Sequence, residues 1–232
     1  MTPTKAPCSL DSAPVAPVLD RLHGEARRDV YRFPLVAASE ALARLTGRST
    51  NAAGMAERFR NLRIPLGPDA GRFAYAVGRT VGAKNVVEFG TSFGISTIYL
   101  AAAVRDNGGG RVIGTELAES KWQAARTNLA EAGLGEVVDV RLGDAMKTLA
   151  EVPKPIDLVL LDGWKDLYLD ILRLLEPSLR PGAVVLADNV NMFKKALAPY
   201  LRYVKTESGR YVSSTLPLGT GMEYSLYTGA RS

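Results

Sequence analysis

The sequence predicts an α/β fold with a doubly wound, mostly parallel sheet, and three observations lead to that class. After residue 84, short apolar runs alternate with helical stretches such as residues 120–131. This alternation is typical of parallel strands joined by right-handed helical crossovers. Near the C-terminus, two strand-like segments flank a glycine-containing turn and predict an antiparallel pair. No internal repeat or second domain interrupts this order. We expect the five parallel strands at 86–89, 111–115, 136–140, 158–161 and 183–187, and the antiparallel pair at 211–216 and 223–227.

The chain of 232 residues has room for one such domain and an N-terminal extension. Residues 1–17 contain repeated prolines and little apolar surface to bury, which predicts a disordered tail. Residues 18–65 show helical apolar spacing with breaks near Pro34 and Gly47, and we expect them to form a lid or a dimer contact. The α/β domain is expected to span residues 66–232, beginning at a stiff loop with two prolines.

The composition argues against several classes of function. The formal net charge is +5, but the Lys and Arg residues are spread along the chain without a dense basic stretch. We therefore expect a solvated surface and no nucleic-acid partner, although a basic rim would also suit an anionic substrate. No segment approaches the roughly 20 apolar residues that span a bilayer, and the N-terminus lacks the apolar core of a signal peptide. We expect no membrane partner and a cytoplasmic location.

A single cysteine and a single histidine restrict the chemistry further. Cys8 has no partner for an intrachain disulfide, and zinc sites built from Cys and His are excluded in practice. A Ser-His-Asp mechanism would depend entirely on His23, close to the predicted tail. Such a mechanism is therefore disfavoured.

The loop after the first expected strand is the predicted cofactor site, because ligands of doubly wound sheets bind beyond the carboxyl ends of the strands. Its glycines, Gly90 and Gly94, follow a G-x-x-x-G spacing and not the G-x-G-x-x-G of dinucleotide-binding loops. Glu88 stands two positions before the first glycine. A carboxylate there would repel a pyrophosphate but suits a ligand with an ammonium and a sulfonium. The loop thus favours S-adenosylmethionine over NAD, while the alternative for Glu88 is a surface residue at a strand end.

Two further loops of the same edge carry candidate cofactor ligands. Glu116 ends the second expected strand, where an acid accepts hydrogen bonds from ribose hydroxyls in both dinucleotide and S-adenosylmethionine folds. Asp144 and Ala145 follow the third strand, where a turn offers backbone N–H groups and a carboxylate to an adenine edge. The alternative for Asp144 is a helix N-cap, and the two roles are compatible.

Acidic and amide side chains follow the fourth and fifth expected strands. Asp162 ends the fourth strand, and Asp188 and Asn189 end the fifth. Neighbouring strands lie about 4.8 Å apart, so these side chains should meet. Two carboxylates that close repel each other unless one is protonated or a cation lies between them. Three oxygen donors favour Mg²⁺, or Mn²⁺ or Ca²⁺, over zinc. The alternative is that they cap their turns independently.

Lys165 is the candidate general base, three residues after Asp162. A cation at Asp162 would disfavour the charged ammonium form, and it would also favour ionisation of a hydroxyl bound to it. Without the neighbouring acids, the default interpretation of Lys165 would be a surface ion pair. Trp164 fits a core position and a wall against a cofactor equally well.

From about Leu66 to the C-terminus, the sequence resembles the cation-dependent O-methyltransferases, the group that contains catechol and caffeoyl-CoA O-methyltransferases. The resemblance lies in three blocks, VVEFGTSFGIS, LDGWKDLYL and VLADNV. It implies a class I methyltransferase sheet with a Rossmann-like order and N-terminal helices. It also implies that Lys165 takes the substrate proton and that the metal is held by Asp162, Asp188 and Asn189. The implied cofactor residues are Leu66, Glu88, Gly90, Thr91, Ser96, Glu116, Leu117, Asp144, Ala145 and Trp164.

Two departures from the family concern the substrate and the adenine wall. Gly163 stands where the catechol enzymes carry a histidine and many caffeoyl-CoA enzymes an alanine. The C-terminal acid that binds the second hydroxyl in the catechol enzymes has no evident counterpart, and Ser213, Ser214 and Thr215 lie near its expected position.

The expected function is transfer of a methyl group from S-adenosylmethionine to one oxygen of a small vicinal-diol phenol, with a divalent metal. The resemblance implies a homodimer, as in the caffeoyl-CoA branch, although the catechol branch includes monomers. The alternatives are a metal-independent methyltransferase, an NAD-linked enzyme and a non-catalytic module that binds the cofactor. Nucleic-acid methylation is disfavoured, because the sequence has no D/N-P-P-Y block and no basic stripe.

Overall fold

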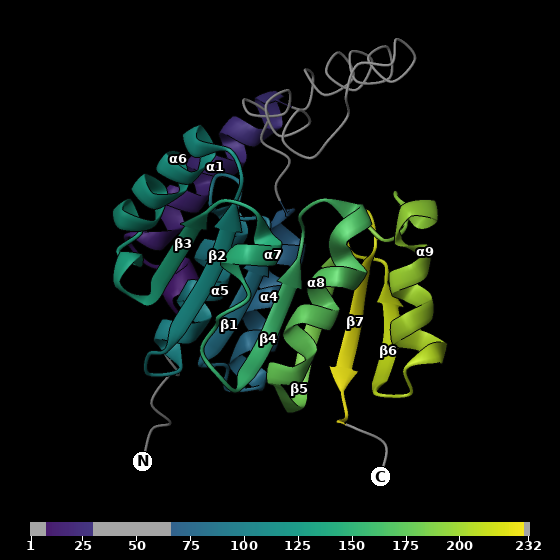
Figure 1. The fold of residues 1–232 in the computed structure, drawn as a ribbon. Coiled ribbons are helices and arrows are strands. Elements are labelled where there is room, and N and C mark those ends of the chain that lie inside the picture. The colour runs from purple at the N-terminus through teal and green to yellow at the C-terminus, as the bar shows by residue number, and fades with distance from the viewer. Residues whose placement is uncertain (1–7, 30–65, 230–232) are drawn as a thin grey trace, which may run out of the picture.

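The computed structural model describes residues 8–29 and 66–229, which form one seven-stranded sheet with helices on both faces (Figure 1). The strands lie in the order β3-β2-β1-β4-β5-β7-β6. Their bounds are β1 Asn85–Phe89, β2 Arg111–Glu116, β3 Val138–Leu142, β4 Ile156–Leu161, β5 Leu179–Asp188, β6 Tyr211–Leu216 and β7 Met222–Tyr227. Strands β1 to β5 pair in parallel, and β7 runs antiparallel to both β5 and β6. The predicted doubly wound sheet with a C-terminal antiparallel pair is confirmed.

The helices divide between the two faces of the sheet. One face carries α1 Val15–Asp29, α4 Pro68–Thr80, α5 Ile95–Asp106 and α6 Glu119–Glu131, and the other carries α7 Ala145–Thr148, α8 Tyr168–Leu175 and α9 Lys194–Arg202 (Figure 1). Short 3-10 turns lie at Ser9–Asp11, Gly135–Val137, Lys165–Leu167 and Glu176–Ser178, and a π-helical turn at Tyr203–Glu207 follows α9.

The sheet separates two hydrophobic cores. Along β4, Leu158 and Leu160 pack toward α4 and α5, whereas Val159 and Leu161 pack toward α8. This is the two-residue alternation of a strand, and every residue of β4 is buried because helices cover both faces. The continuous apolar runs that the sequence shows for the central strands follow from this double burial.

The third strand begins later than the sequence predicts. Residues 136–140 were expected to be extended, but Gly135–Val137 form a 3-10 turn and β3 starts at Val138. Val138 is paired with Val112 of β2, and the backbone oxygen of Glu136 accepts a hydrogen bond from Arg111 instead of joining the ladder (3.0 Å). An apolar run without alternation did not reveal where pairing starts.

The N-terminal segment packs onto the sheet's helical layer, so the prediction of a disordered tail over 1–17 is wrong for residues 8–17. The carboxylate of Asp106 in α5 accepts hydrogen bonds from the backbone N–H (2.8 Å) and the hydroxyl of Ser9. Leu10 and Val15 are buried in the core. Few apolar residues suffice here because they dock on a preformed helical surface. Residues 1–7 lie outside the described part of the chain.

Helix α1 belongs to the same core as the sheet. Its buried residues include Val18, Leu22 and Ala26, and Arg21 pairs with Glu131 of α6. The expected boundary at residue 66 therefore does not separate two cores. The rest of the expected lid or dimer segment, residues 30–65, lies outside the described residues, and its role stays a prediction.

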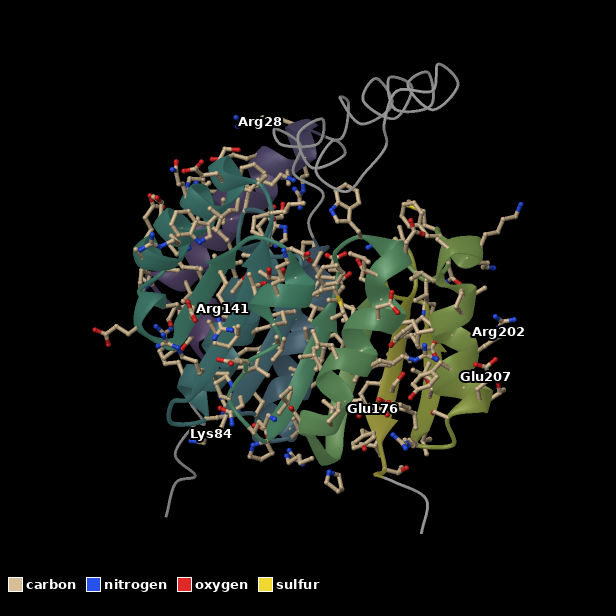
Figure 2. All side chains as sticks on the ribbon, in the orientation of Figure 1. Arg28, Lys84, Arg141, Glu176, Arg202 and Glu207 are labelled. Carbon is tan, nitrogen blue, oxygen red and sulfur yellow. The ribbon has the colours of Figure 1, made fainter. Side chains whose placement is uncertain are left out.

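Charged side chains are distributed over the outside of the domain. The labelled cations Arg28, Lys84, Arg141 and Arg202 come from α1, the turn before β1, β3 and α9 (Figure 2). Among the described helices, none has the length and apolar character needed to cross a membrane.

The order of strands reverses between β1 and β4, and the loops that follow these two strands touch. The backbone N–H of Asp162 donates to the carbonyl oxygen of Phe89 (2.9 Å). A Cβ at Gly90, whose φ is +101°, would lie 2.7 Å from the backbone of Gly163. A Cβ at Gly163 would lie 2.6 Å from the ring of Phe89. The departure at residue 163 thus has a local cause, because the Phe89 ring fills the space of a side chain.

We expect Gly163→Ala to destabilise the protein by about 1–3 kcal/mol, the usual cost of overpacking. The cost should shrink in a Phe89→Leu background, where the ring is gone, so a double-mutant cycle of urea unfolding should show coupling. Gly24→Ala is the control, because a Cβ there meets nothing within 4 Å. Equal costs of Gly163→Ala in both backgrounds would refute the contact with Phe89.

Candidate functional site

Glu88 lies at the floor of the loop after β1, and its side chain is fully buried. Its Oε2 accepts hydrogen bonds from the hydroxyls of Thr91 (2.9 Å) and Thr97. The other oxygen, Oε1, is buried without a hydrogen-bond partner in the described structure. A buried polar atom without a partner is costly, which marks this oxygen as available to a ligand. The alternative of a surface residue at a strand end is therefore excluded for Glu88.

The pKa of Glu88 is raised to about 7, because burial disfavours its charged form. The nearby hydroxyls of Ser96, Thr97 and Thr91 act in the opposite direction, and the charge of Asp162 raises the pKa further. The loop geometry that permits this burial needs glycine at 114 of β2, where a Cβ would lie 2.3 Å from the Thr91 hydroxyl.

Glu116, at the end of β2, accepts hydrogen bonds from the backbone of two loops. One carboxylate oxygen accepts from the backbone N–H groups of Leu117 and Ala118, and the other from that of Ser92, each at 2.8 Å. Ser92 has a φ of +49°, an uncommon backbone conformation for a residue other than glycine. Glu116 thus fixes the cofactor loop and lies where a ribose-binding acid is expected.

The loop after β3 has the structure of a helix start. The side chain of Asp144 accepts a hydrogen bond from the backbone N–H of Met146 (3.0 Å), which is the N-cap geometry. Asp144 is exposed and Ala145 is buried beneath it. The capping role is confirmed, and contact with an adenine stays a prediction.

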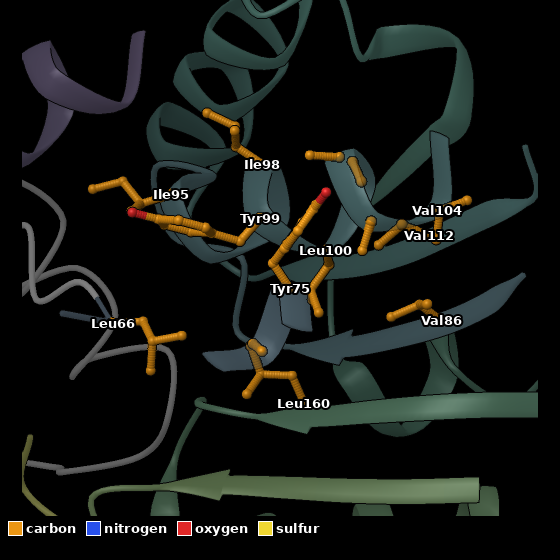
Figure 3. Close-up of a cluster of buried hydrophobic side chains, with 14 of the residues drawn as sticks. Leu66, Tyr75, Val86, Ile95, Ile98, Tyr99, Leu100, Val104, Val112 and Leu160 are labelled. Atoms are coloured by element: carbon orange, nitrogen blue, oxygen red, sulfur yellow. The ribbon is translucent and has the colours of Figure 1, made fainter. Parts of the chain in front are cut away.

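Leu66 precedes α4 and is buried, in the same core cluster as Ile95, Tyr99 and Leu160 (Figure 3). Ile95 of this cluster is the first residue of α5, the helix that follows the cofactor loop. Closure of Leu66 over a cofactor stays a prediction. Trp164, in the loop after β4, is half-buried against the core on the other face of the sheet.

Two acidic residues lie side by side where β4 and β5 end. Leu161 is the register partner of Ala187, so Asp162 and Asp188 are the next residues on adjacent strands. Asn189 then turns the chain sharply with a φ of +67°, which asparagine tolerates. Its amide nitrogen donates to Asp188 Oδ2 (2.8 Å) and to the Thr220 hydroxyl (2.7 Å). The structure therefore brings the three predicted metal ligands to one place.

Burial raises the pKa of both carboxylates, and repulsion by Asp162 raises that of Asp188 further. For Asp188 the pKa rises to about 7, first because the group is buried and then because of the charge on Asp162. For Asp162 burial raises the pKa, while the charge of Lys165 lowers it. Two buried acids that disfavour each other's ionisation are stabilised by a cation between them.

The amine of Lys165 points at this pair. Nζ donates to Asp162 Oδ1 (3.2 Å) and to the hydroxyl of Tyr168 (2.7 Å), and only 15% of the Lys165 side chain is exposed. The ion pair expected as the default for Lys165 exists, but it is formed inside the site with a predicted metal ligand.

The donor set fits a hard divalent cation. In residues 8–29 and 66–229 no three His, Cys, Asp or Glu side chains gather into a metal-binding group. The predicted set has instead two carboxylates and one amide, and its oxygens suit Mg²⁺ or Mn²⁺. His23, by contrast, is bonded to the hydroxyl of Tyr99 (3.0 Å) between α1 and α5, and burial lowers its pKa.

Sequence reasoning missed several residues that complete the site. Thr97, which holds Glu88, is on the first turn of the helix after the cofactor loop, so its place in the loop–helix junction was a usable signal. Tyr168 follows Asp162 and Lys165 at steps of three, the spacing of one helical face. Thr220 comes from the turn between β6 and β7 and gives no local signal.

Glu223 is the acid that lies on the last strand next to the site, since its register partner is Ala187. Its carboxylate is fully buried and accepts hydrogen bonds from Ser213 (2.6 Å) and Thr215, with Lys205 at 3.2 Å. The serine and threonine noted in the sequence therefore hold this acid within the sheet. In this structure Glu223 is not offered to a substrate.

Comparison with known proteins agrees with the geometry. The family model described as "Methyltransferase domain" matches residues 87–190. A catechol O-methyltransferase of Niastella koreensis is 29% identical over 164 residues, which cover 69% of this chain and 73% of that protein. A caffeoyl-CoA O-methyltransferase of Medicago sativa is 25% identical over 150 residues, which cover 59% of this chain and 60% of that protein.

A solved structure shares the fold. The O-methyltransferase TomG from Streptomyces achromogenes, involved in tomaymycin synthesis and determined in complex with S-adenosylmethionine, superimposes with a TM-score of 0.67 at 26% identity. The match covers 78% of this chain and 91% of TomG. With its strand order, its cofactor loop and these relatives, this chain belongs to the family of S-adenosylmethionine-dependent O-methyltransferases that includes the catechol and caffeoyl-CoA enzymes.

Proposed function

We propose that the chain methylates one oxygen of a small phenol with two adjacent oxygens, that a divalent cation is required, and that Lys165 is the general base. The observation that carries the proposal is the meeting of Lys165 with Asp162, beside Asp188 and Asn189, at the sheet edge that also carries the cofactor loop. The names of the catechol and caffeoyl-CoA relatives support the substrate class. A homodimer, implied by the family resemblance, is part of the proposal.

The residues of the site divide into two sets. Glu88 and Glu116, with the loop between them, would hold the cofactor, and Asp162, Asp188 and Asn189 would hold the cation. When bound, S-adenosylmethionine supplies the transferable methyl group, and the cation supplies positive charge that favours the deprotonated form of a nearby hydroxyl. The remaining cofactor contacts proposed are Leu66, Gly90, Thr91, Ser96, Leu117, Asp144, Ala145 and Trp164.

Lys165 would accept the hydroxyl proton on Nζ, where Asp162 is in place to stabilise the resulting ammonium. The freed oxygen lone pair then forms the bond to the methyl carbon as the carbon–sulfur bond breaks. An anion and a cation become neutral products, so the side chains contribute chiefly orientation and control of charge. The Phe193 ring, 5.9 Å from Nζ, provides apolar surface that suits an aromatic substrate.

Lys165→Ala should lower kcat by about 10²- to 10⁴-fold, the usual contribution of a general base. Binding of S-adenosylhomocysteine should be unchanged, because the hydrogen bonds of Lys165 go to Asp162 and Tyr168 and not to the cofactor loop. A labelled-methyl assay on catechols, caffeoyl-type esters and polyphenols with Mg²⁺ measures kcat, and calorimetry measures binding.

Lys154→Ala is the matched control, because Lys154 is exposed at the opposite end of β4. Wild-type turnover in Lys165→Ala would remove Lys165 from the mechanism. Activity that survives excess chelator would make the protein a metal-independent methyltransferase. Cofactor binding without turnover on any substrate would favour a non-catalytic module.

The raised pKa of Glu88 predicts two opposite pH dependences. The folded state binds the Glu88 proton more tightly than the unfolded state, so the stability contributed by Glu88 is present below its ordinary pKa of 4.5 and falls as pH rises to about 7. Replacement by the neutral Glu88→Gln should remove this fall, making the variant more stable than wild type at pH 8 by up to about 3 kcal/mol. Affinity for S-adenosylhomocysteine, which carries an ammonium, should instead rise with pH in wild type only.

Urea unfolding and calorimetry from pH 5 to pH 8 test both expectations on the cofactor-free protein, with the exposed Glu136→Gln as control. Parallel pH profiles of stability for wild type and Glu88→Gln would contradict the buried, proton-binding carboxyl. Unchanged affinity of Glu88→Gln for the ligand would remove Glu88 from the cofactor site.

A further inference from the structure

Tyr168, the first residue of α8, lies directly behind the amine of Lys165. Its side chain is fully buried, and its hydroxyl reaches the edge of the core beneath the acidic pair. The hydroxyl donates to the backbone oxygen of Asp188 (3.2 Å) and accepts from Lys165 Nζ (2.7 Å). Tyr168 therefore links the loop after β4 to the end of β5.

The donor and acceptor roles of this hydroxyl are fixed by its chemistry. A tyrosine hydroxyl has one hydrogen, and here that hydrogen is directed to a carbonyl oxygen that can only accept. The oxygen is left to accept from Lys165. Both the amine and the ammonium of lysine have an N–H to donate, so the bond persists whether or not Lys165 carries a proton.

The ring holds the hydroxyl in place. It makes edge-to-face contacts with Phe89 on one side and Tyr200 on the other, with centroids 6.2 and 5.8 Å away. Nζ of Lys165 also lies 4.9 Å from the centre of the Tyr168 ring. A long flexible lysine is thus anchored by a side chain that the core makes rigid.

Within the described residues Lys165 has two hydrogen-bond partners, Asp162 and Tyr168. Asp162 is also a proposed cation ligand, so its carboxylate oxygens would have to bind both the cation and the Lys165 amine. Tyr168 is uncharged and outside that ligand set, which leaves it as the partner that stays with the amine throughout the reaction.

We propose that Tyr168 is a positioning residue, whose hydroxyl holds the Lys165 amine at the edge of the site facing the substrate oxygen. This inference rests on the proposed role of Lys165 as the base. It assigns Tyr168 no contact with substrate or cofactor, so its effect is confined to the orientation of Lys165.

Tyr168→Phe tests the inference by removing one oxygen and keeping the ring. We expect kcat to fall about 10- to 100-fold through misplacement of the base. The KM for the phenol and the Kd for S-adenosylhomocysteine should stay within about twofold, since binding groups are untouched. A rise in Kd or KM that accounts for the whole loss of kcat/KM, with kcat unchanged, would show a structural role and overturn the proposal.

Tyr200→Phe is the matched control. Tyr200 is equally buried and packs against Tyr168, but its hydroxyl makes no hydrogen bond to Lys165, Asp162 or Asp188. The same substitution there should leave kcat within about twofold of wild type, because the amine keeps its anchor. An equal loss of kcat in both variants would mean that any buried tyrosine hydroxyl matters, contrary to the proposal.

The double variant Lys165→Ala/Tyr168→Phe separates this inference from the proposed function. If Tyr168 acts through Lys165, removing its hydroxyl has no further effect once Lys165 is gone, and the double variant equals Lys165→Ala in kcat. Additive losses would overturn the positioning role. Full activity of Lys165→Ala would instead refute the role of Lys165 as general base. An inactive Lys165→Ala with a fully active Tyr168→Phe would refute only the positioning role of Tyr168.

Discussion

The site depends on the alignment of β4 and β5, which forces two acids out of the same sheet edge at neighbouring positions. Leu161 and Ala187 are register partners, so Asp162 and Asp188 cannot separate without breaking the ladder. Burial raises the pKa of both carboxyl groups, and the charge of Asp162 raises that of Asp188 further. The fold thus maintains two neighbouring carboxylates whose repulsion is relieved by protonation or by a positive partner. Lys165 supplies part of that positive charge, and a cation would supply the rest.

The reversal of strand order between β1 and β4 joins this acidic edge to the cofactor loop. Asp162 is hydrogen-bonded through its backbone to Phe89, one residue from the buried Glu88. A Cβ at Gly90 would meet the backbone of Gly163, and a Cβ at Gly163 would meet the Phe89 ring, so neither position has room for a side chain. If cofactor and substrate bind as proposed, the loops that serve the methyl donor and the acceptor oxygen are in direct contact. Tyr168, whose hydroxyl accepts a hydrogen bond from Lys165, is buried in the core and connects the core to this edge of the sheet.

Much of the fold and of the site could be predicted from the sequence, because local pattern determined it. The continuous apolar runs predicted the central strands, and the polar residues at the ends of these runs predicted Asp162, Asp188 and Asn189 as site residues. Tertiary contacts determined the rest. Ser9 is ordered by Asp106, which is distant in sequence, and the start of β3 is set by pairing with β2. Thr220 and Glu223 reach the vicinity of the site only because β7 inserts between β5 and β6. No pattern within the last strands reports that insertion.

The central claim is that Asp162, Asp188 and Asn189 form one cation site. Crystals of the protein with S-adenosylhomocysteine and Mn²⁺, measured near the manganese absorption edge, test it most directly. The claim predicts one anomalous peak among these three side chains, with oxygen ligands at roughly 2.0–2.6 Å as for hard divalent ions. The peak should be lost in Asp188→Asn and kept in Asp166→Asn, whose exposed side chain belongs to the same loop. A Mn²⁺ peak elsewhere, or none at saturating Mn²⁺ with the Lys165 amine still on Asp162, would contradict the claim.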